Sequence, residues 1–399
     1  MKMRPSRSGR RPLFVENLER RELLAGNVAV SLTGGLLTIT GNNAANHITV
    51  YQQANGRFNI AGLDGEHFTG PTTNLLVRSI TANLQGGDDS IVIAAQPVEG
   101  GEELLPAQVI GAVTVNGGQG SDAITVSVIG RMIGTLPAPN LSVMIDGGYQ
   151  TSGSQNDTVV ILNTATSLLS VNTWGGADTV NLFNVLSLTT LINTDVGGDT
   201  VNVSESAALN ASITLGTVAE TGTTNAVNLE NGLYGTLTVG GTGGIDNVAV
   251  ASTVAALSLT ISTYNGNDAI ILTDVHTGLT QQDIQDLANL LIERFALDVS
   301  QLPFDYAALI ARAPTILGSL NIFAGSGNDT VTMDAVTSTF IINVFLENGN
   351  DSLVATNVES HFANFNGGAG TDGQFTDVDA ILSLLLFENV LPDPGQETT

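Results

Sequence analysis

Residues 175–182 read Gly-Gly-Ala-Asp-Thr-Val-Asn-Leu, and residues 197–203 read Gly-Gly-Asp-Thr-Val-Asn-Val. In both segments an Asp closes a Gly-rich turn, and the two Asp residues, Asp178 and Asp199, are 21 positions apart. Apolar residues stand two and four positions after each Asp. This alternation predicts a short strand with one buried face. The segments therefore predict a unit in which a tight turn leads into a strand.

The same unit recurs along the chain when the residue that closes each turn, here named the anchor, is used for alignment. Where the spacing is most regular, successive anchors are 21 or 22 residues apart, and a fixed period of this size indicates a repeat architecture. A second strand precedes each turn, with its inward residue seven positions before the anchor. The anchors are Asn46, Asp89, Asp122, Asp157, Asp178, Asp199, Asn225, Asp246, Asp268, Asp329, Asp351 and Asp372. The second-strand residues are Val115, Val171, Ile192, Val218, Val239, Ile261, Ile322, Val344 and Phe365.

Two short strands per unit bury their apolar faces best if the chain winds so that equivalent strands stack in parallel. We therefore predict an all-β fold, a right-handed parallel β-helix (a β-solenoid) with coils of 21–22 residues. A sandwich or a propeller is the alternative. A propeller blade, however, needs about 40 residues.

Composition limits the partners. The chain has 399 residues, no Cys and a net charge of −26, and from Gly26 onward it contains only five Arg and no Lys. Such an acidic body repels nucleic acid and anionic lipid and attracts cations. The longest apolar stretch near the end, residues 381–387, is too short to cross a bilayer, so we expect no membrane insertion.

The spacing also predicts the domain organisation. The interval from Asp268 to Asp329 is about 40 residues too long for one repeat, and Thr280-Gln-Gln-Asp283 resembles a helix capping box. We expect a helical hairpin insertion at 276–314, which either packs on the flank or acts as a lid or docking element. The remaining divisions are a leader at 1–26, solenoid at 27–275, its continuation with a C-terminal cap at 315–390, and a disordered tail at 391–399.

The N-terminus carries a short motif. Leu18, Glu19, Arg21, Leu23, Leu24 and Ala25 match the pattern Leu-Glu-x-Arg-x-Leu-Leu-Ala. This stretch resembles the N-terminal motif of large extracellular proteins from planctomycetal bacteria. The resemblance implies that residues 1–26 direct export and that the protein is extracellular or at the cell surface.

Three turns, at 117–122, 325–329 and 367–372, resemble degenerate hemolysin-type calcium-binding repeats, Gly-Gly-x-Gly-x-Asp-x-aliphatic-x. That family holds Ca²⁺ between two facing turns per coil, whereas here each coil has one such turn. Two interpretations stay open: a structural Asp that accepts backbone hydrogen bonds, and a Ca²⁺ ligand. The resemblance makes the following residues candidate metal ligands: Asp122, Asp178, Asp199, Asp246, Asp268, Asp329, Asp351 and Asp372.

Catalytic chemistry finds little support in the sequence. Asn193-Thr194-Asp195 resembles the first motif of polygalacturonase-type hydrolases, but the later motifs of that family do not follow. We therefore assign no catalytic or cofactor-binding residue and expect no enzyme. The predicted function is an extracellular scaffold for a cell surface, matrix or adhesion layer, with a surface glycan or a matrix protein as partner. The alternative is a carbohydrate-active or glycan-binding β-helix of the pectin-lyase-like kind.

Overall fold

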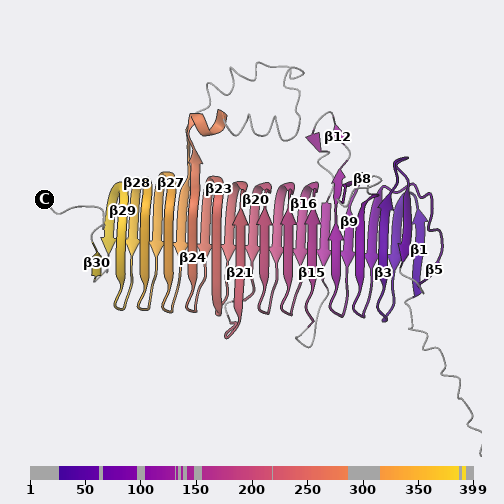
Figure 1. The fold of residues 1–399 in the computed structure, drawn as a ribbon, viewed down its shortest axis with the longest axis horizontal. Helices are drawn as coiled ribbons and strands as arrows, with labels where there is room; N and C mark the ends of the chain where they lie inside the picture. Colours follow the sequence, from indigo (N-terminus) through magenta and orange to yellow (C-terminus); the bar gives the residue numbers. More distant parts are fainter. Residues whose placement is uncertain are drawn as a thin grey trace, which may run out of the picture.

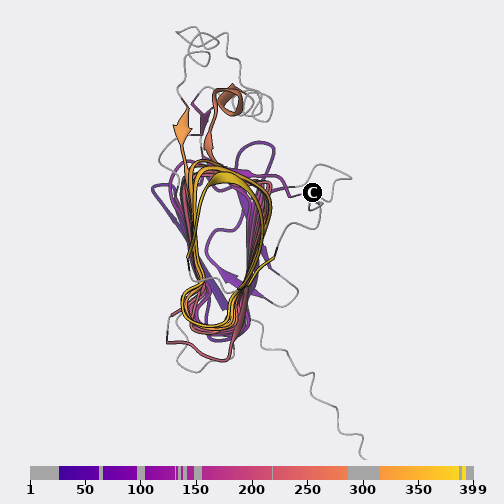
Figure 2. The same cartoon turned by 90° about the vertical axis from the view of Figure 1, so that its left-hand side faces the viewer.

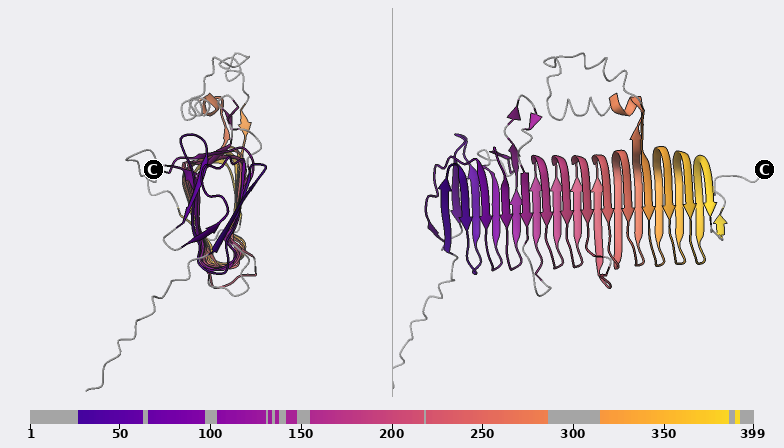
Figure 3. Two further views of the ribbon diagram at one scale, coloured as in Figure 1. Left: turned by 90° about the vertical axis from the view of Figure 1, so that its right-hand side faces the viewer. Right: turned by 180° about the vertical axis from the view of Figure 1, so that it is seen from behind.

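The computed structural model describes residues 27–62, 66–96, 104–130, 132–133, 136–137, 142–147, 155–217, 219–285, 315–385 and 389–391. Over these residues the fold is all-β, as predicted, and most strands run parallel to their neighbours. Figure 1 shows the strands side by side in one long row, and Figure 3 shows the same row from behind. The predicted leader at 1–26 lies outside the described residues.

One wall of the stack consists of the strands that follow the anchors, and we call it the anchor wall. Each of its strands pairs in parallel with the equivalent strand of the next coil, so that Val180 lies beside Val201. Its members, in spatial order, are β3 (His47–Gln52), β7 (Ser90–Ala95), β10 (Ala123–Val126), β15 (Thr158–Leu162), β17 (Thr179–Phe183), β19 (Thr200–Ser204), β21 (Thr224–Glu230), the first part of β23 (Ile245–Ser262), β24 (Ala269–Leu279), and the first parts of β27 (Thr330–Phe345), β28 (Ser352–Asn366) and β29 (Gly373–Leu385), which pairs with β30 (Asn389–Leu391).

The second wall, the return wall, carries the chain back toward the next turn. Its strands also pair in parallel, and the long strands β23, β27, β28 and β29 contribute to both walls. Viewed along the stack, the coils superimpose as a narrow closed outline (Figure 2). The members are β2 (Leu36–Thr40), β6 (Ser79–Asn83), β9 (Val113–Asn116), β14 (Ser142–Asp146), β16 (Ala165–Asn172), β18 (Leu186–Asn193), β20 (Ala207–Thr214), β22 (Leu233–Gly240), β26 (Ser319–Phe323) and the second parts of the long strands.

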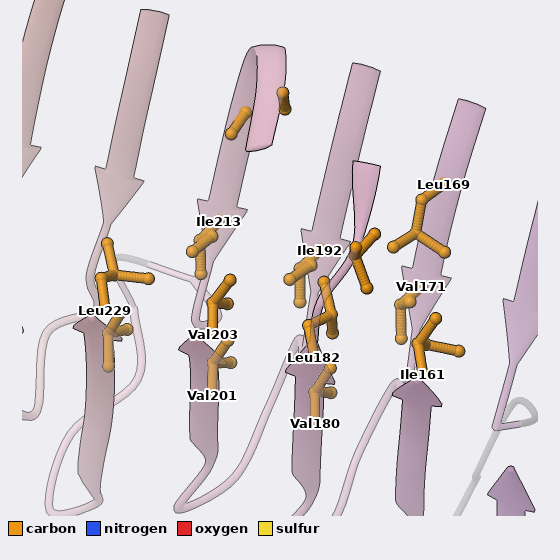
Figure 4. Packing of buried hydrophobic residues seen from close by; sticks show 14 of the residues in the cluster. Ile161, Leu169, Val171, Val180, Leu182, Ile192, Val201, Val203, Ile213 and Leu229 are labelled. Carbon is orange, nitrogen blue, oxygen red and sulfur yellow. The ribbon is translucent and has the colours of Figure 1, made fainter. Parts of the chain in front are cut away.

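The apolar alternation read from the sequence forms the core. Residues two and four positions after the anchors, such as Val201 and Val203, are buried, and they face the inward residues of the return wall, such as Ile213 (Figure 4). Val218, predicted as an inward residue, lies outside the described residues. In that coil Ile213 stands between Ile192 and Val239 in the strand register. The coil from Asp199 to Asn225 spans 26 positions, and its extra residues follow the return strand.

The expected parallel stacking fails at the N-terminal end. There β1 (Asn27–Thr33) pairs antiparallel with β2, and β3 pairs antiparallel with β4 (Phe58–Gly62). The first pair is joined by Gly34 and Gly35, both at positive φ, and a two-residue glycine turn of this kind closes a hairpin. β5 (His67–Thr69) lies parallel to β1. Of the remaining short strands, β8 (Ala107–Val109) pairs in parallel with β11 (Val128–Gly130), and β12 (Met132–Ile133) pairs antiparallel with β13 (Leu136–Pro137).

The insertion begins later than predicted. β24 continues to Leu279 and pairs antiparallel with β25 (Ile316–Leu317), so residues 276–279 are strand rather than helix. The capping box forms as expected: the N–H of Thr280 donates to Asp283 Oδ2 at 2.7 Å, and the N–H of Asp283 donates to Thr280 Oγ1 at 3.2 Å. A helical turn follows at 281–285, and residues 286–314 lie outside the described part. At the other end, Leu391 belongs to β30 rather than to the predicted tail.

Candidate functional site

The Gly–Asp turns stack directly on one another, backbone against backbone. Two positions before the anchors, Gly197 and Gly327 have φ of +154° and +150°. A Cβ atom on Gly197 would lie 1.4 Å from the carbonyl oxygen of Gly176 in the preceding coil, and one on Gly327 would lie 1.3 Å from that of Gly266. A side chain has no space at this position. The contact between coils therefore requires Gly in these turns, and a positive φ adds to this requirement at Gly197 and Gly327.

The anchor carboxylates form a buried ladder along the inside of the turns. The backbone N–H of Asp178 donates to Oδ1 of Asp199 at 2.9 Å, and the same bond recurs from coil to coil at 2.6–3.0 Å. Each anchor thus pairs a backbone donor of the neighbouring coil. The bonds run from Asn46 to Asp89, Asp89 to Asp122, Asp122 to Asp157, Asp157 to Asp178, Asp178 to Asp199, Asp199 to Asn225, Asp246 to Asp268, Asp268 to Asp329, Asp329 to Asp351 and Asp351 to Asp372.

The second carboxylate oxygen of most anchors is buried without a hydrogen-bond partner. This holds for Oδ2 of Asp89, Asp122, Asp178, Asp199, Asp268, Asp329, Asp351 and Asp372. Burial raises the pKa of Asp199 to about 7 and that of Asp89 to about 8, although the N–H bond from the preceding anchor opposes the shift in each. Burial likewise raises the pKa of Asp329 to about 7 and that of Asp122, Asp178, Asp268 and Asp351 to about 6. The ladder therefore retains protons at a pH where ordinary carboxylates have lost them.

Asp246 is the exception among the anchors. Its Oδ2 accepts the N–H of Thr242 at 2.6 Å, and its Oδ1 accepts Nδ2 of Asn225 at 2.9 Å. The amide of Asn225 stands where most other coils have an anchor carboxylate. Both oxygens of Asp246 are thus paired within the protein.

A second ladder runs along the outside of the turns, one residue before the anchors. The N–H of Asn350 donates to Oδ1 of Asn328, and the N–H of Thr371 donates to Oδ1 of Asn350, both at 2.9 Å. The donor here belongs to the later coil, whereas in the buried ladder it belongs to the earlier coil. In the turns that form both bonds, two neighbouring residues therefore bind the adjacent coils with opposite donor and acceptor roles. Related bonds join Ser121 to Asp88, Asn156 to Ser121, Ala177 to Asn156 and Asn328 to Asn267.

The predicted metal ligands are all anchors of the buried ladder. Ca²⁺ takes about six to eight oxygen ligands. Here Oδ1 of every predicted ligand already accepts a hydrogen bond from the neighbouring coil, including Oδ1 of Asp372 at the end of the ladder. The residue five positions before the anchor lies beside the second carboxylate oxygen, since a Cβ on Gly117 would be 2.3 Å from Asp122 Oδ2. In other coils this position holds the apolar residues Leu84, Ala324 and Leu346, which supply no side-chain oxygen to a metal ion. Among the described residues no group of three or more His, Asp or Glu has an arrangement that holds a metal ion. The geometry favours the structural interpretation, and Ca²⁺ binding stays a prediction.

The hydrolase-like motif is divided among separate environments. Asn193 is exposed, Thr194 is buried, and Asp195 lies in the turn at a φ of +60°. Asp88 and Asp89 are divided in the same way, because the first belongs to the outer ladder and the second to the buried one. Neither segment directs two carboxylates toward one point on the surface.

Sequence reasoning missed a group of aromatic side chains on the return wall. Phe323 and Phe345 stack at a centroid distance of 5.4 Å, and Phe340 and Phe362 meet edge to face at 5.8 Å. Each pair is 22 residues apart in the sequence, which is the repeat period. A search for aromatic residues separated by one period finds both pairs without a structure.

Comparison with known proteins gives one match. The model of a family described as Planctomycete extracellular matches residues 9–28, a segment that includes the six motif residues of the leader. No curated protein and no solved structure matches the chain. Within the described ranges, no helix has the length and apolar character needed to cross a membrane. The family match supports a planctomycete extracellular protein and agrees with the location predicted from the leader.

Proposed function

We propose that this protein is a non-enzymatic extracellular scaffold, built as a right-handed parallel β-helix, that serves in a cell-surface, matrix or adhesion layer. The observation that carries the proposal is the pair of ladders along the turns. The buried ladder follows the described coils from Asn46 to Asp372, and the outer ladder joins the turns from Asp88 to Ala177 and from Asn267 to Thr371. Together they give an elongated body with repeated contacts between coils. The handedness follows from the strong preference of parallel crossovers for the right-handed form.

The carboxylates support the non-enzymatic part of the proposal. A catalytic acid or base has to reach a substrate within hydrogen-bonding distance. The anchor carboxylates are at most 3% exposed, and those of Asp199 and Asp329 each accept a backbone hydrogen bond inside the stack. They stabilise turns and are closed to polymeric substrates.

Two measurements test this proposal. Treatment of intact native cells with protease should degrade the protein at the cell surface, or the protein should be detected in the culture medium. Protein that is found only inside the cells contradicts the extracellular role. Incubation with polygalacturonate, alginate and xylan should release no reducing ends and no unsaturated uronate absorbing in the ultraviolet. Measurable turnover of any of these polymers supports the carbohydrate-active alternative.

Calcium binding by the Gly–Asp turns is a separate proposal on the same residues. A cation near the anchors would relieve repulsion between carboxylates of adjacent coils, which are about 4.8 Å apart at the usual strand spacing. Thermal unfolding followed by far-UV circular dichroism, in EDTA and then in millimolar Ca²⁺ with Mg²⁺ as control, tests it. A Ca²⁺-specific rise in melting temperature supports ion binding by linkage. Equal melting temperatures in the three conditions show that the turns act without it.

A further inference from the structure

The outward face of β26, β27 and β28 on the return wall combines exposed aromatic rings with a row of amides, and we call it the aromatic face. Except for Phe340, its residues alternate with the buried Leu320, Ile322, Ile342, Val344, Ala363 and Phe365, so their side chains stand on the outside. Phe340 lies where the strand register shifts and is 41% exposed. The face consists of Asn321, Phe323, Phe340, Asn343, Phe345, Phe362, Asn364 and Asn366.

The rings lie in two pairs at opposite ends of this face. Phe323 and Phe345 are strand neighbours, and their rings stack with an interplanar angle of 8°. Phe362 is the strand neighbour of Ile341, which lies four residues before Phe345 and therefore about 13 Å from it at the usual rise. The second pair, Phe340 and Phe362, marks that far end. Phe323, Phe340 and Phe362 are 36–42% exposed and stand on one face, and exposed apolar residues that gather on one face mark interaction surfaces.

Amides occupy the strip between the two aromatic pairs. Asn321, Asn343 and Asn364 are register neighbours, and Nδ2 of Asn343 donates to Oδ1 of Asn321 at 2.9 Å. An Asn side chain has two donor hydrogens and two acceptor lone pairs. The bond between the two amides uses one of each, so the row offers both donors and acceptors to a molecule lying on it.

A small groove opens beside the stacked pair. It is lined by Phe323, Phe345, Glu347, Asn366 and Gly368 and has a volume of about 230 Å³. This is smaller than the ~300–1,000 Å³ of a typical small-molecule site, so it suits one ring of a longer ligand. The ring faces supply apolar contact, and the carboxylate of Glu347 and the amide of Asn366 supply polar groups at the rim.

This combination fits a pyranose sugar. A pyranose ring presents C–H groups on its faces, which pack on aromatic rings, and hydroxyl groups at its edge, which bond to amides and carboxylates. Charge selects among sugars: no Lys or Arg occurs after Arg312, and the groove contains Glu347. A uronate, a sulfated glycan or a nucleic acid would meet repulsion without a compensating cation.

We propose that the aromatic face binds a neutral oligosaccharide, with one sugar ring on Phe323 and Phe345, another near Phe340 and Phe362, and the intervening hydroxyl groups on the Asn row. This goes beyond the scaffold function, because it assigns a ligand class and a site to the body. Binding here requires no turnover, so it is measured independently of the activity assays above.

Isothermal titration of the full-length protein with cellohexaose, xylohexaose, mannohexaose and chitohexaose tests the proposal, with hexagalacturonate as the anionic comparison. We expect at least one neutral oligomer to bind with a Kd below about 1 mM. Hexagalacturonate should bind at least about tenfold more weakly. Phe345→Ala should weaken binding of the neutral oligomer at least about tenfold, since it removes half of the stacked platform.

Phe183→Ala is the matched control, because Phe183 is similarly exposed, at 41%, but lies on the anchor wall. This variant should leave the Kd unchanged. Phe345→Leu addresses the fold: it keeps an apolar side chain but removes the flat ring, so binding should still fall while the melting temperature stays close to that of the wild type. The proposal is wrong if none of the four neutral oligomers binds, or if Phe345→Ala and Phe183→Ala give the same Kd. If sedimentation instead shows that the protein self-associates without sugar and that Phe345→Ala makes it monomeric, a second copy of the chain is the occupant of the aromatic face. This result would also overturn the proposal.

Discussion

Each coil turns at two corners, and the two corners tolerate very different residues. The Gly–Asp turn places Gly two positions before most anchors, whereas the opposite corner, six positions after the anchor, holds several residue types at nearly the same backbone conformation. At this second corner φ lies between +45° and +54° in all eight of the following residues: Asn163, Asn184, Glu205, Asn231, Ser252, Asp274, Ala335 and Asn357. Both corners thus use positive φ, but only the position two before the anchor is restricted to Gly in most coils.

Space explains this difference. A Cβ atom at Gly197 would overlap the backbone of the preceding coil, whereas at the second corner residues as different as Glu205 and Ala335 carry side chains. A left-handed conformation costs a non-Gly residue about 1–2 kcal/mol, which a folded protein tolerates. An overlap with backbone atoms of the next coil is not tolerated, because the coil spacing is set by the hydrogen bonds of both walls. Contact between coils, more than φ, therefore sets how strictly a position is specified.

The largest effect should come from filling the Gly column. Gly197→Ala should destabilise the protein by more than about 3 kcal/mol or prevent folding, because the added methyl has to displace the backbone of Gly176. Gly175→Ala is the matched control, since its nearest contact, the carbonyl oxygen of Val196, would lie 3.6 Å from the new Cβ. Urea unfolding measures both. Similar losses in the two variants would remove contact between coils as the explanation.

Two substitutions at one anchor of the buried ladder distinguish the role of the acceptor oxygen from that of the negative charge. Asp199→Ala leaves the N–H of Asp178 buried without an acceptor and should cost about 1–3 kcal/mol. Asp199→Asn keeps an oxygen for that bond and removes a charge that burial disfavours, so at pH 8 it should be at least as stable as the wild type. Asn225 already stands at an anchor, which shows that the turn accepts an amide. Equal losses for Ala and Asn at pH 8 would contradict this role.

The same carboxylates make stability depend on pH. The pKa of Asp199 and Asp329, near 7 in the folded protein, lies above its value in the unfolded chain, so the folded state binds more protons between about pH 4 and pH 7. This contribution is fully present below the unfolded pKa and is lost as pH rises through the folded value. The melting temperature should therefore fall from pH 5 to pH 8, and less steeply in the double variant Asp199→Asn with Asp329→Asn. A rise over this range would show that the carboxylates ionise without cost.

The smallest effect belongs to the second corner. Ala335 holds a φ of +54°, where Asn is several times more frequent than Ala, so Ala335→Asn should stabilise the protein by less than about 1 kcal/mol. The reverse change at Asn184, Asn184→Ala, should destabilise by about 1 kcal/mol, partly because Nδ2 of Asn184 donates to Asn163 Oδ1 at 2.8 Å. Chemical denaturation resolves changes of this size. A loss above about 3 kcal/mol at either residue would make the two corners equivalent.

Local patterns in the sequence predicted much of the described fold. The alternation after Asp178 and Asp199 identified the buried residues, and the capping box at Thr280 and Asp283 forms as read. The antiparallel pair at the N-terminus was missed, although Gly34-Gly35 is a hairpin signal, because the repeat period was extended to a region without it. The start of the insertion was placed too early because residues 276–279 continue a strand whose partner, β25, lies some 40 positions later in the sequence.

The sequence by itself determined which residues occupy equivalent positions, because parallel strands stacked in register turn a period of 21 or 22 residues into a column in space. It did not determine what each column does. Asn328 and Asp329 are adjacent polar residues of one turn, yet one side chain accepts a hydrogen bond on the outside and the other is buried. Only the tertiary structure decides between them, because the direction of each side chain depends on how the neighbouring coil lies against the turn.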